Sequence, residues 1–279
     1  MSTPNPSAPS AENSSEATQS LAPRNDVEGS APTGPRLYSE LSRWYRLLTP
    51  IEEYVGEAAA YVAALTSVTA RRNPTLLELG AGAGHNAFHM KRHFGSSVLT
   101  DLSPEMLALS REINAESEHV VGDMRSLRLD REFDCVFVHD ALCYMLTEDD
   151  LERAIKTAFV HTRPFGVALF APDFFRETFV VGTEMGGADA ENGSRGLRYL
   201  SWSADPDPDD TTYTVDFAMM LREGGRVSVE HDRHVEGLFP RATWERLLTE
   251  VGFEVSTTTR PAGEAWEGHE EAFLAKRPK

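Results

Sequence analysis

Glycines follow an apolar, strand-like segment in the first third of the chain. Leu76–Gly84 reads LLELGAGAG, so the apolar run passes directly into glycines at positions 80, 82 and 84. Glycine lets a backbone turn sharply and approach a ligand closely. A dinucleotide-binding fingerprint requires glycine at position 85, where this chain has His85, and no Gly-Lys-Ser/Thr sequence marks a P-loop. The turn therefore indicates a nucleoside site that lacks the pyrophosphate-binding pattern.

Carboxylates follow the next two predicted strands. Asp101 closes the second strand, about twenty residues after the glycine turn, where an acidic side chain can accept both ribose hydroxyls. Its alternative role is to cap the following helix, although Ser103 suits that role better. Asp123 follows the third strand and can accept an adenine amino group, with Leu102 or Met124 packed on the ring. The alternative for Asp123 is an ordinary loop aspartate.

Three polar residues follow the strand predicted at 134–138. His139, Asp140 and Tyr144 stand at or just after its carboxyl end. An amine or hydroxyl that acts as a nucleophile must lose a proton, and a His or Asp at this place is suited to take it. We therefore predict these three residues as catalytic. The alternatives are that Asp140 caps the following turn and that Tyr144 packs in the core.

An acidic segment without an obvious helix follows the fifth predicted strand. Residues 172–236 contain fourteen acidic side chains and six arginines, a net charge of −8. Its predicted strands are 199–202, 213–221 and 227–235. The last two are joined by Glu223-Gly224-Gly225, which is typical of a β-hairpin. The segment leaves the sheet at the edge where open α/β folds bind ligands, so we expect a substrate lid with Asp173 and Phe174 contacting the acceptor. The alternative is a dimer contact made by the hairpin.

Histidines at helical spacing raise the question of a metal site. His85, His89 and His93 would share one helix face, a spacing that can bind a divalent ion. No matching set of carboxylates is evident, and an exposed polar face is the commoner arrangement. We therefore predict no metal.

Strands and helices alternate through the rest of the chain. The predicted strands are 75–79, 97–100, 119–121, 134–138 and 166–170, and the predicted helices between them are 86–93, 104–113 and 148–161. A helix at 241–251 and strands at 255–257 and 271–275 follow the acidic segment. Such alternation predicts an α/β fold with a mostly parallel sheet that helices cover on both faces.

The chain divides into four predicted parts. Residues 1–35 contain almost no large apolar side chains, so we expect a disordered tail. Residues 36–171 should form N-terminal helices (36–50 and 51–69) and the ligand-binding core. Residues 172–236 form the antiparallel insertion, and residues 237–279 complete the core.

Charge and composition exclude several classes of protein. The net charge of −17 argues against nucleic-acid partners, which require a basic surface. No apolar run approaches the roughly 18 residues of a membrane span, and no signal peptide is evident, so we expect a cytoplasmic protein. The two cysteines, Cys135 and Cys143, lie in or near apolar segments and should be buried free thiols.

The motifs LLELGAGAG, TDLSPEML, GDMRSL and FDCVFVHDALCYM together resemble the class I S-adenosylmethionine-dependent methyltransferases in order and spacing. The resemblance covers about residues 37 to 279 and implies a Rossmann-like sheet of seven strands whose last strand, 271–275, is antiparallel. It also implies S-adenosylmethionine as cofactor, with Gly80 and Gly82 near the methionine part, Asp101 at the ribose, Asp123 at the adenine and His139 on the methionine side. The full implied cofactor set is Tyr45, Glu78, Gly80, Ala81, Gly82, Asp101, Leu102, Met106, Asp123, Met124 and His139.

The chain also looks like small actinobacterial N-methyltransferases that act on amino sugars. Those share an N-terminal Tyr near the sulfonium (Tyr45 or Tyr38 here), antiparallel strands after the fifth strand, and a segment like Gly237–Pro240. His139-Asp140 and the long acidic insertion depart from that pattern. We therefore predict methyl transfer to an amine or hydroxyl of a small molecule in secondary metabolism, by a monomer or homodimer. The alternatives are a protein or polyamine methyltransferase, or a non-catalytic cofactor-binding protein.

Overall fold

The computed structural model describes residues 34–69, 71–261 and 269–279. Almost all of the predicted tail, residues 1–35, therefore lies outside the described residues. Gly34–Lys279 forms one compact unit.

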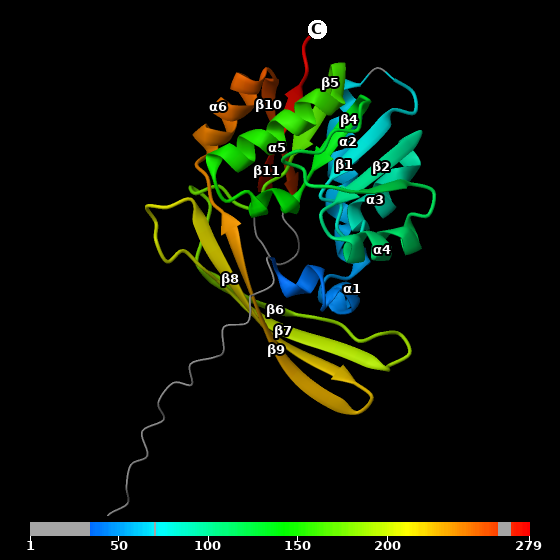
Figure 1. Ribbon diagram of the computed structural model, residues 1–279, viewed down its shortest axis with the longest axis vertical. Coiled ribbons are helices and arrows are strands. Elements are labelled where there is room, and N and C mark those ends of the chain that lie inside the picture. The colour runs from blue at the N-terminus through cyan, green and yellow to red at the C-terminus, as the bar shows by residue number, and fades with distance from the viewer. Residues whose placement is uncertain (1–33, 70, 262–268) are drawn as a thin grey trace, which may run out of the picture. The chain divides into compact units, whose positions relative to one another are not determined.

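Seven strands form the main sheet, in the order β10-β11-β5-β4-β1-β2-β3 (Figure 1). Their bounds are β1 Thr75–Leu79, β2 Ser96–Asp101, β3 Glu118–Val121, β4 Phe133–Val138, β5 Thr162–Phe170, β10 Glu254–Pro261 and β11 His269–Lys276. Strands β3, β2, β1, β4 and β5 are parallel neighbours, and β11 is antiparallel to both β5 and β10. The predicted Rossmann-like fold with an antiparallel last strand is confirmed.

Helices cover both faces of this sheet. The α-helices are α1 Tyr45–Leu48, α2 Val55–Val68, α3 His85–Met90, α4 Pro104–Ile113, α5 Glu148–His161 and α6 Arg241–Val251. The 3-10 helices are η1 Arg36–Tyr38, η2 Ser42–Trp44, η3 Ile51–Tyr54, η4 Lys91–His93 and η5 Asp140–Tyr144. Side chains alternate along a strand, so Leu77 packs toward α5 and α6 whereas its neighbour Leu76 packs toward α2 and α3. Both faces of the central strands are therefore buried.

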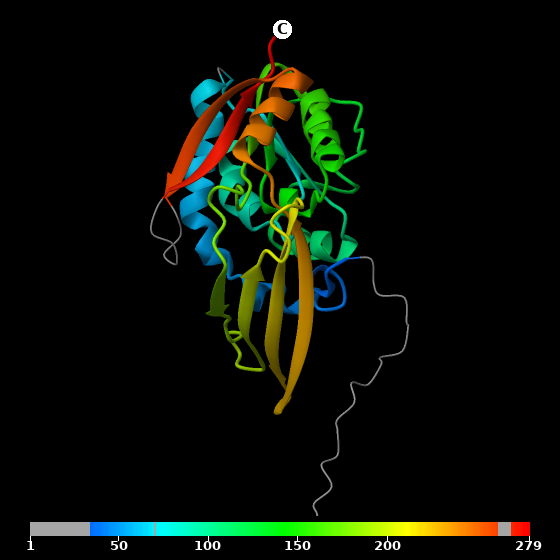
Figure 2. The ribbon, with the colours of Figure 1, turned by 90° about the vertical axis from the view of Figure 1, so that its left-hand side faces the viewer.

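A second, antiparallel sheet follows β5, in the order β6-β7-β8-β9. Its strands are β6 Gly182–Gly186, β7 Arg195–Ala204, β8 Thr212–Glu223 and β9 Arg226–Gly237. Gly224 and Gly225 have φ angles of +57° and +77°, which suits the two-residue turn predicted between the last two strands. Figures 1 and 2 show this sheet beyond the edge where the parallel strands end. Strand β6 was not predicted, because its sequence is glycine-rich.

The N-terminal segment lies between the two sheets (Figure 1). Leu37, Leu41 and Trp44 pack against Leu197 and Met219 of the second sheet. On the other side, Ser103 Oγ, at the start of α4, donates a hydrogen bond of 2.5 Å to the carbonyl of Tyr38. The single helix predicted over 36–50 is wrong, because the segment forms short 3-10 turns and one turn of α-helix. Its apolar side chains pack on the second sheet while its backbone is bonded to the start of α4.

Two further expectations concern the cysteines and membrane spans. Cys135 and Cys143 are buried free thiols, as predicted. Among the described residues, no helix combines the length and the apolar character needed to cross a bilayer.

Candidate active site

The glycine turn connects β1 to α3 through left-handed backbone. Gly80, Gly82 and Gly84 have φ angles of +77°, +52° and +75°. A Cβ atom on Gly80 would lie 2.2 Å from the Cβ of Ala141, whereas one on Gly82 would meet only the methyl group of Met106, at 3.7 Å. Gly80 is therefore required by its neighbours, and the backbone at Gly82 is open to a ligand.

Asp101 ties this turn to the end of β2. Its Oδ2 accepts a hydrogen bond of 2.8 Å from Gly82 N–H, and its Oδ1 accepts one of 2.8 Å from Ser103 N–H. Burial raises the pKa of Asp101, and these backbone donors oppose that shift. Ser103 Oγ, and not Asp101, accepts from Met106 N–H at the start of α4. Asp101 is therefore not the helix cap and keeps lone pairs for a further donor.

Glu78 is the buried carboxylate of β1. Its side chain is 3% exposed, and its Oε2 has no hydrogen-bond partner among the described residues. Burial raises the pKa of Glu78 to about 8. An unsatisfied buried carboxylate is costly, and a cation beside it would remove that cost.

The residues predicted around an adenine ring follow β2 and β3: Met124 is buried, and Leu102 is 67% exposed. Met106, also predicted at the cofactor, is buried on α4. Asp123 forms an ion pair of 2.7 Å with Arg125, which also reaches Asp150 at 3.2 Å. The hydrogen bonds from Arg125 lower the pKa of Asp123. The sequence did not indicate this arginine partner.

His139 is held on both ring nitrogens at the end of β4. Its Nδ1 lies 3.4 Å from Asn86 Nδ2, which also donates to Glu57 Oε1 at 2.8 Å. Its Nε2 lies 2.8 Å from Asp140 Oδ1 and 3.8 Å from Glu57 Oε2. The amide is a donor, so Nδ1 accepts and the proton of a neutral imidazole is on Nε2, facing carboxylates. This arrangement orients the His139 ring between Asn86 and Asp140.

Tyr144 belongs to a chain of hydrogen bonds that reaches the second sheet. Its hydroxyl lies 2.8 Å from that of Tyr38 and 2.9 Å from His234 Nδ1. His234 Nε2 lies 3.2 Å from Asp232 Oδ2, which also accepts from Leu37 N–H at 2.8 Å. Burial lowers the pKa of His234, but its bonds to the neighbouring carboxylates outweigh burial and raise it. His234 and Asp232 were not predicted as site residues.

A cavity of about 180 Å³ opens beside His139 and Asp140. It is lined by Glu53, Tyr54, Glu57, His139, Asp140 and Asp173. Asp173, predicted as a substrate contact, therefore faces the cavity. Phe174 packs instead on Phe179 and Tyr213, with ring centroids 5.5 and 5.8 Å away.

Tyr45 and His85 face each other at the N-terminal side of the site. Their ring centroids are 5.6 Å apart, and Tyr54 packs on His85 at 5.0 Å. Burial raises the pKa of Tyr45 to about 12 and lowers that of His85 to about 4. Both nitrogens of His85 are buried without a hydrogen-bond partner in the described part of the chain. The sequence marked His85 only through its helical spacing.

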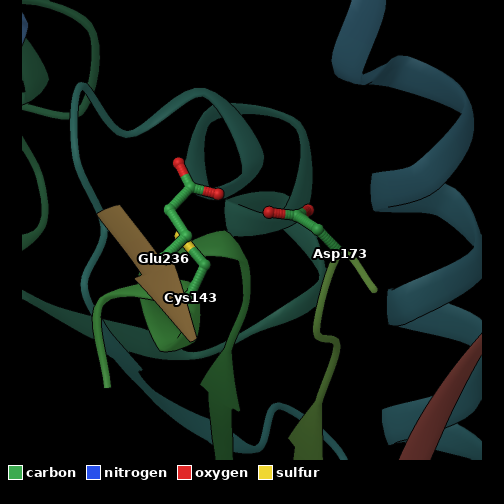
Figure 3. Close-up of side chains that lie close together, drawn as sticks. All are labelled: Cys143, Asp173 and Glu236. Atoms are coloured by element: carbon green, nitrogen blue, oxygen red, sulfur yellow. The ribbon is translucent and has the colours of Figure 1, made fainter. Parts of the chain in front are cut away.

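The helical histidines do not meet at one point. His85 faces Tyr45, His89 Nε2 lies 2.8 Å from the carbonyl of Ile51, and His93 pairs with Arg92. Their predicted exposed face is wrong for His85, which is buried. Within the described residues, the donor atoms that gather closely are those of Cys143, Asp173 and Glu236 (Figure 3).

The comparisons with known proteins agree with this geometry. A family profile described as a methyltransferase domain matches residues 76–166. The chain is 28% identical over 234 residues to the dTDP-3-amino-3,6-dideoxy-alpha-D-glucopyranose N,N-dimethyltransferase of Streptomyces fradiae, covering 82% of this chain and 90% of the relative. This chain is an S-adenosylmethionine-dependent methyltransferase. The methyltransferase is also 28% identical over 205 residues to a Streptomyces venezuelae N,N-dimethyltransferase of the 3,4,6-trideoxy sugar, covering 73% and 85% of the two chains.

Solved structures share the fold of the methyltransferase. Streptomyces venezuelae DesVI superimposes with a TM-score of 0.73 at 24% identity and covers 86% of this chain and 98% of its own. CalS10, an amino pentose methyltransferase of Micromonospora echinaspora solved with S-adenosylmethionine bound, gives a TM-score of 0.70 at 21% identity, covering 85% and 96%.

The residues of the methyltransferase fit its cofactor. S-Adenosylmethionine is positively charged at its sulfonium and α-ammonium groups, and Glu78 is a buried carboxylate with an unsatisfied oxygen. The open backbone at Gly82 and the free lone pairs of Asp101 stand at successive strand ends, as a nucleoside requires.

Proposed function

We propose that this methyltransferase transfers a methyl group to the amino nitrogen of a small amino sugar, as a cytoplasmic enzyme of antibiotic-type secondary metabolism. Two relatives that match most of the chain carry names of amino-sugar N,N-dimethyltransferases. The observation that carries the proposal is the chain from Tyr38 through Tyr144 and His234 to Asp232, because it offers a route for the proton that an ammonium group must lose. A protein methyltransferase or a non-catalytic binding protein gains no support from these relatives.

We propose the following roles at the cofactor. Asp101 holds the ribose hydroxyls, Glu78 the α-ammonium group, and the backbone at Gly82 lies against the methionine part. Asp123 accepts from the adenine amine and shares its charge with Arg125. The remaining wall residues are Tyr45, Gly80, Ala81, Leu102, Met106, Met124 and His139. When bound, S-adenosylmethionine supplies a methyl carbon activated by the adjacent sulfonium, so aligning the acceptor nitrogen with it provides much of the rate acceleration.

Tyr144 is the proposed proton acceptor for the sugar amine. Burial raises the pKa of Tyr144 well above its ordinary value, so the phenol stays neutral until it passes its own proton on. His234 Nδ1 can accept that proton, since its Nε2 faces Asp232, and the resulting imidazolium is stabilised by Asp232 and Glu236. The neutral amine then provides the electron pair for the new N–C bond. We assign His139 to positioning and Asp140 to contact with the acceptor amine.

The second sheet is proposed to cover the site as a lid. Its inner face presents His234 and Glu236, which are buried, toward the end of β4. Its outer face carries exposed Leu200, Trp202 and Val229, which fits the homodimer contact proposed for the hairpin.

The amine requirement is tested with matched acceptors. Purified enzyme, S-adenosylmethionine and a panel of amino sugars are compared with the same sugars in which hydroxyl replaces the amine. We expect methylation of the amino sugars alone. Equal methylation of the hydroxyl analogues, or methylation of proteins instead, would contradict the proposal.

A further inference from the structure

We propose that binding of the cofactor's amino-acid end moves one proton, in net, from Glu78 to His85. Before binding, both side chains are neutral. After binding, a carboxylate stands beside the α-ammonium group and an imidazolium stands beside the carboxylate of the methionine part. This inference rests on the proposed cofactor site, in which Glu78 faces the α-ammonium group, and it adds a partner for the cofactor's carboxylate.

Glu78 and His85 flank the glycine turn that connects β1 to α3. Glu78 lies two residues before Gly80, and His85 directly follows Gly84. Both residues are 3% exposed. Within the described residues, Glu78 Oε2 and both ring nitrogens of His85 are buried without a hydrogen-bond partner. Buried polar groups are almost always paired, so two unsatisfied side chains at one turn indicate that a ligand supplies their partners.

The His85 ring lies against the wall of the site. It packs on Tyr54, with ring centroids 5.0 Å apart, and on Tyr45 at 5.6 Å. Tyr54 itself lines the cavity. The methionine part is expected at the same end of the turn, since the backbone at Gly82 is its proposed contact. Because both ring nitrogens are buried, a carboxylate reaches them only if one of the two tyrosine rings moves.

Burial decides the protonation state of Glu78 before the cofactor binds. A buried carboxylate without a cation beside it is costly, so the carboxyl group keeps its proton. Burial raises the pKa of Glu78 to about 8. His139 opposes this rise, and Asp101 and Glu57 add to it. An arriving α-ammonium group favours the negative form, and Glu78 then releases its proton.

His85 responds in the opposite direction. Burial lowers the pKa of His85 to about 4, and repulsion by Arg46 and His89 adds to this effect. The imidazole is therefore neutral near neutral pH, with one N–H donor and one acceptor nitrogen. A carboxylate beside the ring favours the charged form and offsets the repulsion by Arg46. His85 then takes up a proton.

The two protonation changes balance. Glu78 loses one proton and His85 gains one, so binding exchanges no net proton with the solvent. The protein gains a negative charge beside the ammonium group and a positive charge beside the carboxylate. Such charge-assisted pairs are strong where water is partly excluded. Between about pH 4 and 8, these two residues therefore make no net contribution to the pH dependence of cofactor affinity.

The test counts protons at about pH 6, between the two pKa values. Titration calorimetry in two buffers with different heats of ionisation, such as phosphate and Bis-tris, gives the number of protons exchanged on binding. The probes are S-adenosylhomocysteine and its decarboxylated analogue S-adenosyl-3-thiopropylamine, which keeps the amine. With the full-length wild type, S-adenosylhomocysteine should exchange no net proton. The analogue should release about one proton, because Glu78 responds and His85 does not.

Two variants separate the contributions of the two residues. In His85→Gln, an amide donates but takes up no proton, so S-adenosylhomocysteine should release about one proton. In Glu78→Gln it should instead cause uptake of about one. His85→Gln should weaken S-adenosylhomocysteine binding roughly tenfold and leave the affinity for the analogue within about twofold. His93→Gln, at an exposed histidine of η4, is the matched control and should reproduce the wild-type proton count.

Proton counts that differ from these overturn the inference. Equal counts for the two probes on the wild type would refute it, and so would a wild-type count in His85→Gln. Melting curves check that each variant folds, and the comparison of probes on the wild type decides the question without any variant. Failure of S-adenosylhomocysteine to bind the wild type would overturn the proposed cofactor site as well. Binding with the wrong proton count overturns this inference alone.

Discussion

Asp101 accepts two backbone hydrogen bonds, and a carboxylate has lone pairs for further donors. Asp101→Ala should weaken S-adenosylhomocysteine binding by roughly 1.5–3 kcal/mol, the usual cost of losing hydrogen bonds to a charged group. Titration calorimetry measures this affinity, and Asp209→Asn, at an exposed carboxylate on the loop before β8, is the control. A change smaller than twofold would assign ribose recognition to another residue.

Glu78 makes the stability of the ligand-free protein depend on pH. Its pKa is raised to about 8, whereas a glutamate in the unfolded chain has a pKa of about 4.3. Between those values the folded state holds a proton that the unfolded state has lost, so the contribution of Glu78 to stability falls as pH rises. Glu78→Gln should remove this dependence, so the melting temperature of the wild type should drop relative to the variant between about pH 4.5 and 8. Parallel melting curves across that range would show that Glu78 is ionised in the folded state.

Tyr144 tests the proton route. Tyr144→Phe should reduce kcat by roughly 10²-fold or more, the lower range for general base catalysis. The affinity for S-adenosylhomocysteine should stay within twofold, because Tyr144 lies on the acceptor side. The residual rate should rise with pH as more acceptor amine becomes neutral. A wild-type kcat in the variant would show that the amine gives its proton to solvent and not to Tyr144.

Among single residues, the sequence predicted those that follow the carboxyl ends of the parallel strands, because a parallel sheet brings these ends together. It did not predict His234 as a partner of Tyr144, since 90 positions separate them and only the docking of the second sheet joins them. The arginine partner of Asp123 was missed for a different reason: charge pairing on a loop leaves no periodic signal.

The glycine turn is the element on which cofactor binding depends. Gly80 has a positive φ, and a Cβ atom there would collide with Ala141 and the methyl group of Met124. Gly80→Ala should lower the melting temperature and abolish cofactor binding, whereas Gly56→Ala, at a helical position with open space around it, should not. Cofactor affinity near that of the wild type in Gly80→Ala would mean that the turn can move away from η5.

Element prediction succeeded where periodicity and burial coincide. Strand β4 is buried at all six positions, and its apolar run was readable directly. Strand β6 was missed because it begins and ends in glycine and its three central residues are all exposed, so it shows no alternation. The segment at 36–50 has helical spacing, yet Trp44 and Leu37 are drawn onto the second sheet, and tertiary packing overrides the local preference.

In the whole molecule, the site exists because three distant segments converge at the carboxyl edge of one sheet. The strand ends supply the proposed cofactor residues, the N-terminal segment supplies Tyr38 and Tyr45, and β9 supplies His234 and Glu236. Part of the acidic surplus behind the net charge of −17 lies at the site, since carboxylates line the cavity.

The central claim is methyl transfer from S-adenosylmethionine to an amine nitrogen. The most direct measurement incubates the enzyme with S-adenosylmethionine carrying an isotopically labelled methyl group and with an amino-sugar panel, then locates the label in the product by NMR. We predict labelled N-methyl signals that depend on Asp101 and on Tyr144. Label on oxygen or carbon, or no transfer from a cofactor that is demonstrably bound, would contradict the account.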